Sequence, residues 1–267
     1  MEWVRGGCLG YGSSSTVHLA TTKKSSSSSY PAVMAVKSCN QSDTTLLKNE
    51  REIFNEIGFC PEIIQCFGDC QTVEEDNEHL YNLLLEYAKG GSLAYQLKKS
   101  GGCLQESDVK DYTRSILKGL RHIHSKGFVH CDMKLDNMLL FENGEVKIAD
   151  FGLAKKAGEK QGRVEIRGTP LYMAPESVNN NEYESGVDIW ALGCAIVEMV
   201  TGKPAWNKWV SIQSFSPISE VWSDGKLESI FPSLHSSCLA SPPDRIRQLT
   251  GDRSCNWCDS GCWITIR

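Results

Sequence analysis

The first part of the chain alternates short apolar stretches with turns rich in glycine and serine. β-Branched and apolar residues concentrate at 17–20 (V-H-L-A) and 32–36 (A-V-M-A-V), which predicts two strands. The serine run at 25–29 between them cannot pack a core and predicts a hairpin loop, with a phosphorylated serine patch as the alternative. The stretch Y-N-L-L-L-E-Y-A at 81–88 predicts a buried strand that runs into a linker.

Farther along, apolar positions recur at helical spacing. Residues 44–57 predict a helix that ends at Gly58. A second helix is predicted from about residue 107 and a third over roughly 186–201. Their predicted core-facing residues are Leu46, Leu47, Ile53, Phe54 and Ile57, then Val109, Tyr112, Ile116, Leu120 and Ile123, then Ile189, Ala191, Leu192, Ala195, Ile196 and Met199.

The order of these elements predicts the fold class. Strands come first and helices follow, which is typical of an α+β protein with two lobes and a cleft between them. The K-G-G-S-L turn at 89–93 is the natural boundary. We therefore predict a small β-rich lobe over residues 1–88 and a larger helical lobe over residues 89–234.

Composition narrows the function classes. A net charge of −5 gives no support for nucleic-acid binding. No apolar run reaches the roughly 18 residues of a membrane span. The 12 cysteines lack paired spacing and the N-terminus lacks a secretory signal, so we expect reduced thiols in the cytosol or nucleus.

Two short motifs carry the candidate chemistry: H-C-D-M-K-L-D-N at 130–137 and D-F-G at 150–152. Asp132, in a tight loop, can accept a proton from a hydroxyl group. Asn137 and Asp150 can each hold a metal ion. Together these groups are suited to moving a phosphoryl group between a nucleotide and an alcohol.

These motifs, with G-T-P-L-Y-M-A-P-E at 168–176 and D-I-W-A-L-G at 188–193, resemble the eukaryotic protein kinase family over residues 3–235. The resemblance implies the bilobal kinase fold, with ATP and Mg²⁺ as cofactors. It implies that Asp132 is the catalytic base and that Lys134 stabilises charge on the transferring phosphoryl group.

The same resemblance makes Asn137 and Asp150 the magnesium ligands. His130 is expected to be structural, holding the loop and the D-F-G turn.

The nucleotide-binding residues follow from the resemblance. L-G-Y-G-S-S-S-T-V at 9–17 is similar to a kinase glycine-rich loop, although a serine-rich hairpin turn is the alternative for this segment alone. Leu85 corresponds to the gatekeeper, and the backbone of 86–88 is expected to bind adenine. The residues expected to contact ATP are Leu9, Gly10, Gly12, Val17, Ala35, Lys37, Leu85, Glu86 and Ala88.

A kinase lysine, here Lys37, requires a carboxylate from the following helix. The helix offers Glu50, Glu52 and Glu56. Glu50 fits the family pattern E-x-x-apolar-apolar and is the predicted partner, with Glu52 expected on the solvated face.

Within the family, Lys134 and Thr169 resemble the serine/threonine branch. Three segments resemble those of plant MEKK-like mitogen-activated protein kinase kinase kinases. They are W-V-R-G-G-C-L-G-Y-G-S-S-S-T-V, L-E-Y-A-K-G-G-S-L and T-G-K-P-A-W. The resemblance implies a monomer that phosphorylates a downstream mitogen-activated protein kinase kinase. The alternative is a truncated kinase fold that binds nucleotide or partners without useful turnover.

Two features depart from the family pattern. Cys131 stands where an arginine usually binds a phosphate on the activation segment, and residues 152–168 contain no Ser, Thr or Tyr. We therefore expect no switching by phosphorylation of that segment, with Thr169, directly after it, as the alternative site. Its basic residues, Lys155, Lys156, Lys160, Arg163 and Arg167, suggest either acidic docking or a solvated loop, and a solvated loop is the prediction.

The second departure is the end of the chain. Beyond Leu234 we find no helical periodicity and no D-P-x-x-R element to pair with Glu176. We expect 235–267 to be an atypical, poorly ordered tail on a shortened helical lobe. The unpaired Glu176 and the exposed core surface are expected to lower the free energy of unfolding by several kcal/mol. C-x-x-C-x-x-x-C at 255–262 invites a zinc interpretation, but the usual second half is absent.

Overall fold

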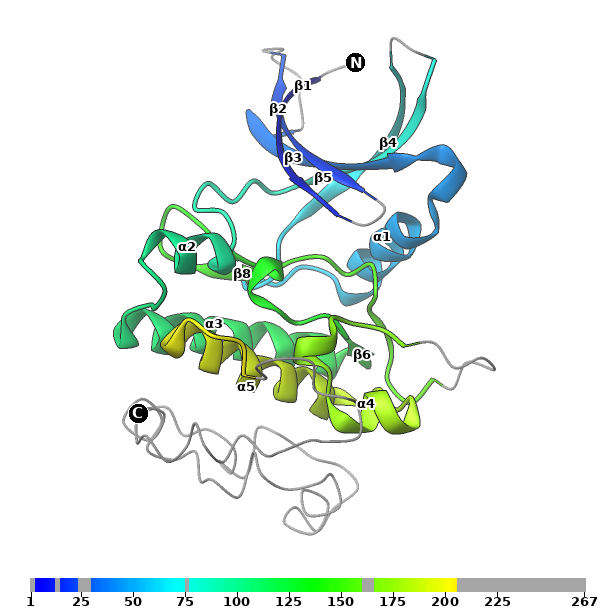
Figure 1. The fold of residues 1–267 in the computed structure, drawn as a ribbon. Coiled ribbons are helices and arrows are strands. Elements are labelled where there is room, and N and C mark those ends of the chain that lie inside the picture. Colours follow the sequence, from blue (N-terminus) through cyan, green and yellow to red (C-terminus); the bar gives the residue numbers. More distant parts are fainter. Residues whose placement is uncertain (1–2, 13–14, 24–29, 75–76, 160–165, 206–267) are drawn as a thin grey trace, which may run out of the picture.

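The N-terminal lobe is an antiparallel sheet of five strands in the order β1-β2-β3-β5-β4. The computed structural model describes residues 3–12, 15–23, 30–74, 77–159 and 166–205, and Figure 1 shows their arrangement. The strands are β1 (Trp3–Tyr11), β2 (Thr16–Thr22), β3 (Val33–Asn40), β4 (Cys66–Val73) and β5 (His79–Leu85).

One helix, α1 (Thr45–Ile57), packs against β4 and β5 of this sheet. Its buried residues include Leu47, Ile53 and Phe54, so the predicted apolar face is confirmed. Gly58 ends the helix with φ of 68°, a conformation that favours glycine. The carboxylate of Glu50 lies within the same buried stripe.

Two strands of the sheet were not predicted from the sequence. Glycines interrupt the apolar alternation in both, and the ladder contains register shifts at the same places, between Arg5 and Gly10 in β1 and between Cys66 and Gly68 in β4. Bulges of this kind insert unpaired residues into a strand and hide its period of two. Gly68, with φ of 140°, is one of the residues that permits this bend.

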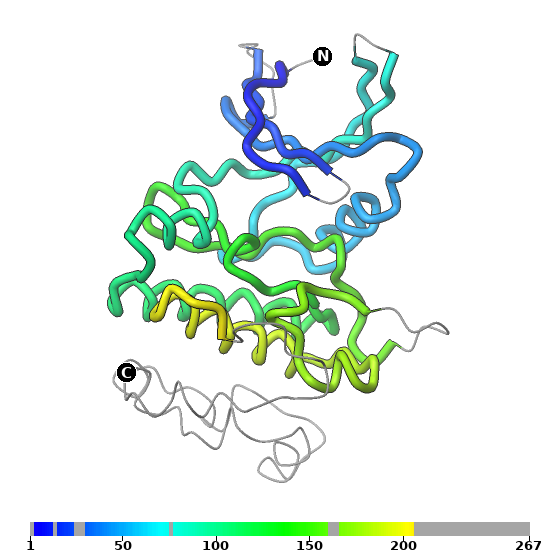
Figure 2. Tube along the Cα trace, viewed as in Figure 1, coloured from blue at the N-terminus to red at the C-terminus, as the bar shows by residue number. Residues whose placement is uncertain are grey.

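The second lobe is mainly helical. Its long helices α3 (Glu106–Ser125) and α5 (Ser185–Thr201) pack against each other, and α2 (Leu93–Lys99) and α4 (Pro175–Asn180) lie at its edges (Figures 1 and 2). Its described residues also form two short ladders: β6 (Phe128–Val129) with β9 (Lys155–Lys156), and β7 (Met138–Leu140) with β8 (Val146–Ile148). The described part of the chain has three 3-10 turns: η1 (Gln41–Asp43), η2 (Leu135–Asn137) and η3 (Pro170–Tyr172).

The two lobes share one hydrophobic core. It joins Leu83 of β5 and Phe54 of α1 to Leu120 of α3 and Leu192 of α5. A backbone connection reinforces it, because the Ile64 N–H donates to the carbonyl oxygen of Ile148 over 3.0 Å. The predicted α+β, two-lobed fold is confirmed for the described residues. The proposed boundaries of the lobes, at 88/89 and 234/235, stay predictions.

Among the residues that the structure describes, no helix is both long and apolar enough to cross a bilayer. The serine run at 25–29, the cysteine-rich segment 255–262 and the whole predicted tail lie outside the described residues.

Candidate active site

Lys37 lies on β3, the central strand of the five-stranded sheet. The register of the sheet places it opposite Val17 on one side and Leu83 on the other. Because side chains alternate along a strand, Lys37 shares a sheet face with Ala35, two residues before it. Its ammonium group donates to Glu50 Oε2 and to Asp150 Oδ1, both over 2.7 Å.

The charges of these three residues depend on one another. Burial acts to lower the pKa of Lys37, but the two carboxylates outweigh it and raise that pKa, so the lysine stays protonated. Burial likewise acts to raise the pKa of Asp150, but the adjacent Lys37 holds it below its usual value. Burial raises the pKa of Glu50, which is fully enclosed, against the opposing effect of Lys37.

The structure distinguishes among the three candidate glutamates of α1. Glu50 contacts Lys37 and also accepts the backbone N–H of Phe151 over 3.1 Å. Glu52 is exposed, and Glu56 is exposed and pairs with Lys156 at 3.3 Å. Glu50 is thus the glutamate that reaches both the lysine and the D-F-G turn.

Asn49, beside Glu50, was not singled out from the sequence. Its side-chain amide donates to the carbonyl oxygens of Gly152 and Ala154, over 3.2 and 3.3 Å. Two neighbouring residues of α1 therefore bind the segment that begins at Asp150. An amide directly before a buried carboxylate on an amphipathic helix is the signal that could have identified it.

Aromatic packing fixes the D-F-G turn from below. The ring of Phe151 lies 5.1 Å from that of Phe54 on α1 and 4.9 Å from that of His130. His130 also contacts the carbonyl oxygen of Ala149 through Nε2, at 3.1 Å. The expectation that His130 holds the loop and the turn together is confirmed.

A buried carboxylate on α5 anchors the loop that carries Asp132. Asp188 accepts the backbone N–H groups of His130 and Cys131, each over 2.9 Å, and contacts His124 Nε2 at 2.8 Å. Its role was not predicted, although a lone carboxylate in the first turn of an otherwise apolar helix was a readable signal. Buried charges are retained where hydrogen bonds satisfy them.

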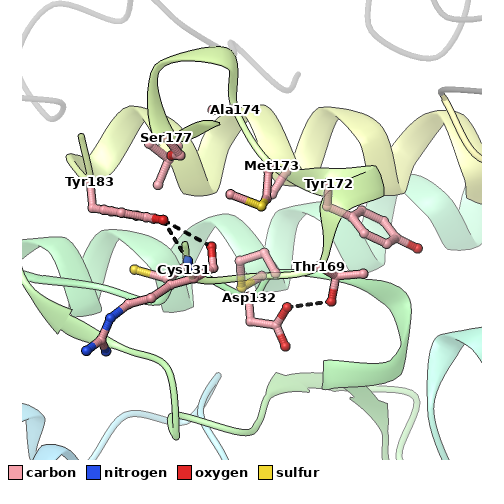
Figure 3. Close-up of a pocket in the computed structure, with 12 residues that line it drawn as sticks. Cys131, Asp132, Thr169, Tyr172, Met173, Ala174, Ser177 and Tyr183 are labelled. Carbon is pink, nitrogen blue, oxygen red and sulfur yellow. Dashed lines mark hydrogen bonds between the residues drawn. The ribbon is translucent and has the colours of Figure 1, made fainter. Parts of the chain in front are cut away.

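The carboxylate of Asp132 is oriented by three side chains. Thr169 donates to Oδ1 over 2.7 Å, as Figure 3 shows, and Lys134 donates to Oδ2 over 2.7 Å. Lys134 also donates to the Thr169 hydroxyl over 3.0 Å. Asn137 donates to the backbone carbonyl and to Oδ2 of Asp132, over 2.8 and 3.1 Å.

Asn137 and Asp150 fit the predicted role of metal ligands. Neither Asn137 Oδ1 nor Asp150 Oδ2 accepts a hydrogen bond from the described residues, and both are the hard oxygen donors that Mg²⁺ prefers. The described residues contain no group of three or more His, Cys, Asp and Glu suited to a metal ion. Mg²⁺ is commonly held by one or two protein ligands together with substrate phosphates, and two ligands are what Asn137 and Asp150 would supply.

Several residues predicted to contact ATP pack against the core that the two lobes share. Ala35 and Leu85 are buried, and Val17 and Leu139 pack against the same core from either lobe. Leu139, on β7, was not predicted. Gly10 pairs with Val17 across the β1–β2 ladder.

The glycine-rich turn and the linker contain further residues that are predicted to contact ATP. The Gly12 N–H donates to Ser15 over 2.7 Å and closes the turn, while Leu9 is exposed. In the linker, the Glu86 carboxylate is held by Lys147 at 2.6 Å. The carbonyl of Glu86 and the N–H of Ala88 have no hydrogen-bond partner among the described residues, and their predicted contact with adenine stays a prediction.

Comparison with known proteins agrees with this geometry. The family model described as "Protein kinase domain" matches residues 3–238. The chain belongs to the protein kinase family. That match also extends past residue 234, the predicted end of the kinase lobe.

The kinase has similar relatives in Arabidopsis thaliana. It is 56% identical over 212 residues to mitogen-activated protein kinase kinase kinase 20, covering 78% of this chain and 61% of that protein. It is 43% identical over 208 residues to mitogen-activated protein kinase kinase kinase 17, covering 78% and 54%. It is 39% identical over 250 residues to mitogen-activated protein kinase kinase kinase 18, covering 91% and 70%. The kinase spans less than two thirds of the first two relatives.

The basic activation segment differs from the prediction of a solvated loop. Lys155 is buried, donates to the Glu159 carbonyl oxygen over 2.5 Å and faces the ring of Tyr183, so the prediction was wrong for this residue. Lys156 pairs with Glu56, and Arg167 donates to the Leu153 carbonyl oxygen over 3.3 Å. Lys160 and Arg163 lie outside the described residues.

Proposed function

We propose that this kinase transfers the γ-phosphoryl group of ATP to a serine or threonine hydroxyl of a protein substrate. The orientation of Asp132 carries the proposal. Both oxygens of its carboxylate are engaged by Thr169, Lys134 and Asn137, so the side chain is held in one orientation. A base held in this way can receive the proton of a substrate hydroxyl as it attacks.

The remaining roles follow from position. Lys37, held by Glu50, would contact the α- and β-phosphates, and Lys134 would offset charge on the transferring group. Asn137 and Asp150 would hold Mg²⁺, which neutralises phosphate oxygens and orients them for in-line transfer. Ala35, Val17, Leu85 and Leu139 would enclose the adenine ring by apolar contact.

We further propose that the substrate is a mitogen-activated protein kinase kinase. The support is the similarity to three Arabidopsis proteins named as kinases of that substrate class. We also propose that the kinase is a monomer and works in the cytosol or nucleus. The eight described cysteines are all free thiols, as expected for a reducing compartment.

The alternative of a binding module without turnover gains no support from the described geometry, since Lys37, Glu50, Asp132, Asn137 and Asp150 are all in place. The test is transfer of labelled phosphate from Mg-ATP to a catalytically dead mitogen-activated protein kinase kinase. Thermal unfolding with and without nucleotide should run in parallel. Transfer supports the proposal, and a nucleotide-induced stabilisation without transfer supports the binding module.

A further inference from the structure

Tyr183 binds the C-terminal limb of the activation segment, by which we mean residues 166–168; the N-terminal limb is residues 152–159. It lies between α4 and α5 and is only 4% exposed. Its hydroxyl accepts the backbone N–H of Arg167 over 2.7 Å and donates to the carbonyl oxygen of the same residue over 3.4 Å (Figure 3). One hydroxyl therefore satisfies both backbone groups of a residue two positions before Thr169.

The same tyrosine also contacts the N-terminal limb of the segment. Its backbone carbonyl accepts the N–H of Gly158 over 3.4 Å, and the Lys155 ammonium lies 5.4 Å from the centre of its ring. The Arg167 guanidinium links the limbs a second time, through the Leu153 carbonyl oxygen. Tyr183 thus lies where the two limbs of the segment converge.

The two residues after Arg167 contact the catalytic loop directly. Gly168 follows it with φ of 110°, and a Cβ atom there would lie 2.5 Å from the carbonyl oxygen of Cys131. Only glycine permits this contact. Thr169 comes next and donates to Asp132. Two hydrogen-bonded contacts, joined by the peptide bonds of residues 167–169, therefore connect the Tyr183 hydroxyl to the proposed catalytic base.

Apolar side chains surround this path, with the charged groups of Asp188 and Lys155 beside them. Cys131 packs in one cluster with Val129, Ala174, Tyr183 and Val187. Burial raises the pKa of the Cys131 thiol, and the neighbouring Asp188 carboxylate adds to the effect, so the side chain is uncharged. The cluster has the chemistry to bind an aromatic ring rather than a phosphate.

We propose that Tyr183 is a positioning residue that holds the activation segment in its substrate-binding arrangement without phosphorylation. Residues 152–168 contain no hydroxyl group that could carry a phosphate, and the tyrosine hydroxyl supplies the contact that closes the segment. The inference rests on the proposed kinase function and extends it to regulation. It assigns the positions of Gly158 and Arg167 to a residue outside the segment itself.

The test compares the full chain with Tyr183→Phe, which keeps the ring and removes the hydroxyl. Tyr95→Phe is the matched control, because Tyr95 is exposed on α2. Each protein is treated with phosphatase and checked by intact mass. Rates are then measured with protein substrate and with ATP varied separately, and amide hydrogen exchange is followed over 166–173.

We expect phosphatase to leave the wild-type rate unchanged. Losing about one net hydrogen bond should lower kcat/KM for protein substrate about fivefold in Tyr183→Phe, with KM for ATP nearly unchanged. Exchange at Arg167 should accelerate in that variant alone. Both variants should unfold within a few degrees of the wild type, which separates positioning from general instability.

The inference is overturned if phosphatase abolishes the wild-type rate. It is equally overturned if Tyr183→Phe keeps both the wild-type kcat/KM and the wild-type protection of Arg167. Absence of turnover in every preparation would overturn the proposed function instead. In that case exchange at Arg167 still decides whether the tyrosine holds the segment.

Discussion

The residues around Lys37 and the apolar cluster around Tyr183, which packs against the activation segment, are stabilised by different interactions. Around Lys37, three formal charges, those of Lys37, Glu50 and Asp150, lie within hydrogen-bond distance. Beneath the segment, Cys131 and Tyr183 contribute a neutral thiol and a neutral hydroxyl to an apolar cluster. These two regions lie on either side of Asp132.

The difference separates chemistry from scaffolding. Buried charge contributes little net stability, but it fixes position and binds phosphate, so it belongs where ATP would lie. The cluster around Tyr183 only has to hold the activation segment in place, and apolar packing with one hydroxyl group is sufficient for that. In this account the first region depends on ligand and pH, whereas the second depends on packing.

The largest expected effect is at Asp132, between the two regions. Asp132→Asn keeps the shape of the side chain and removes the proton acceptor, so we expect kcat to fall by about 10²- to 10⁴-fold. Stabilisation by Mg-ATP in a thermal unfolding assay should remain. Asp111→Asn, an exposed site on α3, is the control and should keep wild-type activity. Equal activity in both variants would remove Asp132 from the mechanism.

The next effect tests the charged region. Glu50→Gln should reduce kcat/KM by about 10- to 100-fold, because charge-assisted hydrogen bonds to Lys37 and Phe151 are lost. Glu52→Gln, two residues away and exposed, should have no effect. Steady-state kinetics with ATP varied would decide between them. If Glu52→Gln lowered kcat/KM more than Glu50→Gln, Glu50 would not be the functional partner of Lys37.

A smaller effect tests the neutral region. Cys131→Arg would place a charge in the apolar cluster, and we expect the free energy of unfolding to fall by about 2 kcal/mol. Urea unfolding measures the change. Cys103→Arg is the control at an exposed cysteine and should be close to neutral. A stable Cys131→Arg variant would show that this cluster accepts charge and would weaken the comparison.

The smallest effect concerns Glu176, in the first turn of α4. Burial, with a contribution from Glu182, raises its pKa. The folded state therefore binds its proton more tightly than the unfolded state, and stability is lost as pH rises through and above the usual glutamate range near about 4.3. Glu176→Gln should become slightly more stable than the wild type on going to neutral pH. Urea midpoints that stay parallel across that range would contradict this.

The sequence predicted α1, α3 and α5, because each has a sustained apolar period that tertiary packing then uses. It predicted Lys37, Asp132, Asn137 and Asp150 as candidates from motifs that resemble those of protein kinases. The structure brings Lys37 within hydrogen-bond distance of Asp150, and Asn137 within hydrogen-bond distance of Asp132. Their individual roles stay predictions until tested. β1 and β4 were missed because glycine bulges break their alternation.

The contacts of Tyr183 and Asp188 were not predicted from the sequence. Tyr183 acts on a residue 16 positions before it, and Asp188 on residues 57 and 58 positions before it. Such contacts depend on how α5 docks beneath the catalytic loop, which no local pattern encodes. Lys155 was expected in solvent because it is charged, yet its aliphatic chain and ammonium are enclosed by the fold.

The most direct test of the central claim is phosphoryl transfer by the full, phosphatase-treated chain. The substrate is a catalytically dead mitogen-activated protein kinase kinase, and the modified residues are identified by mass spectrometry. The account predicts Mg²⁺-dependent transfer to serine or threonine that disappears in Asp132→Asn. Nucleotide binding without transfer, or transfer that persists in Asp132→Asn, would contradict it.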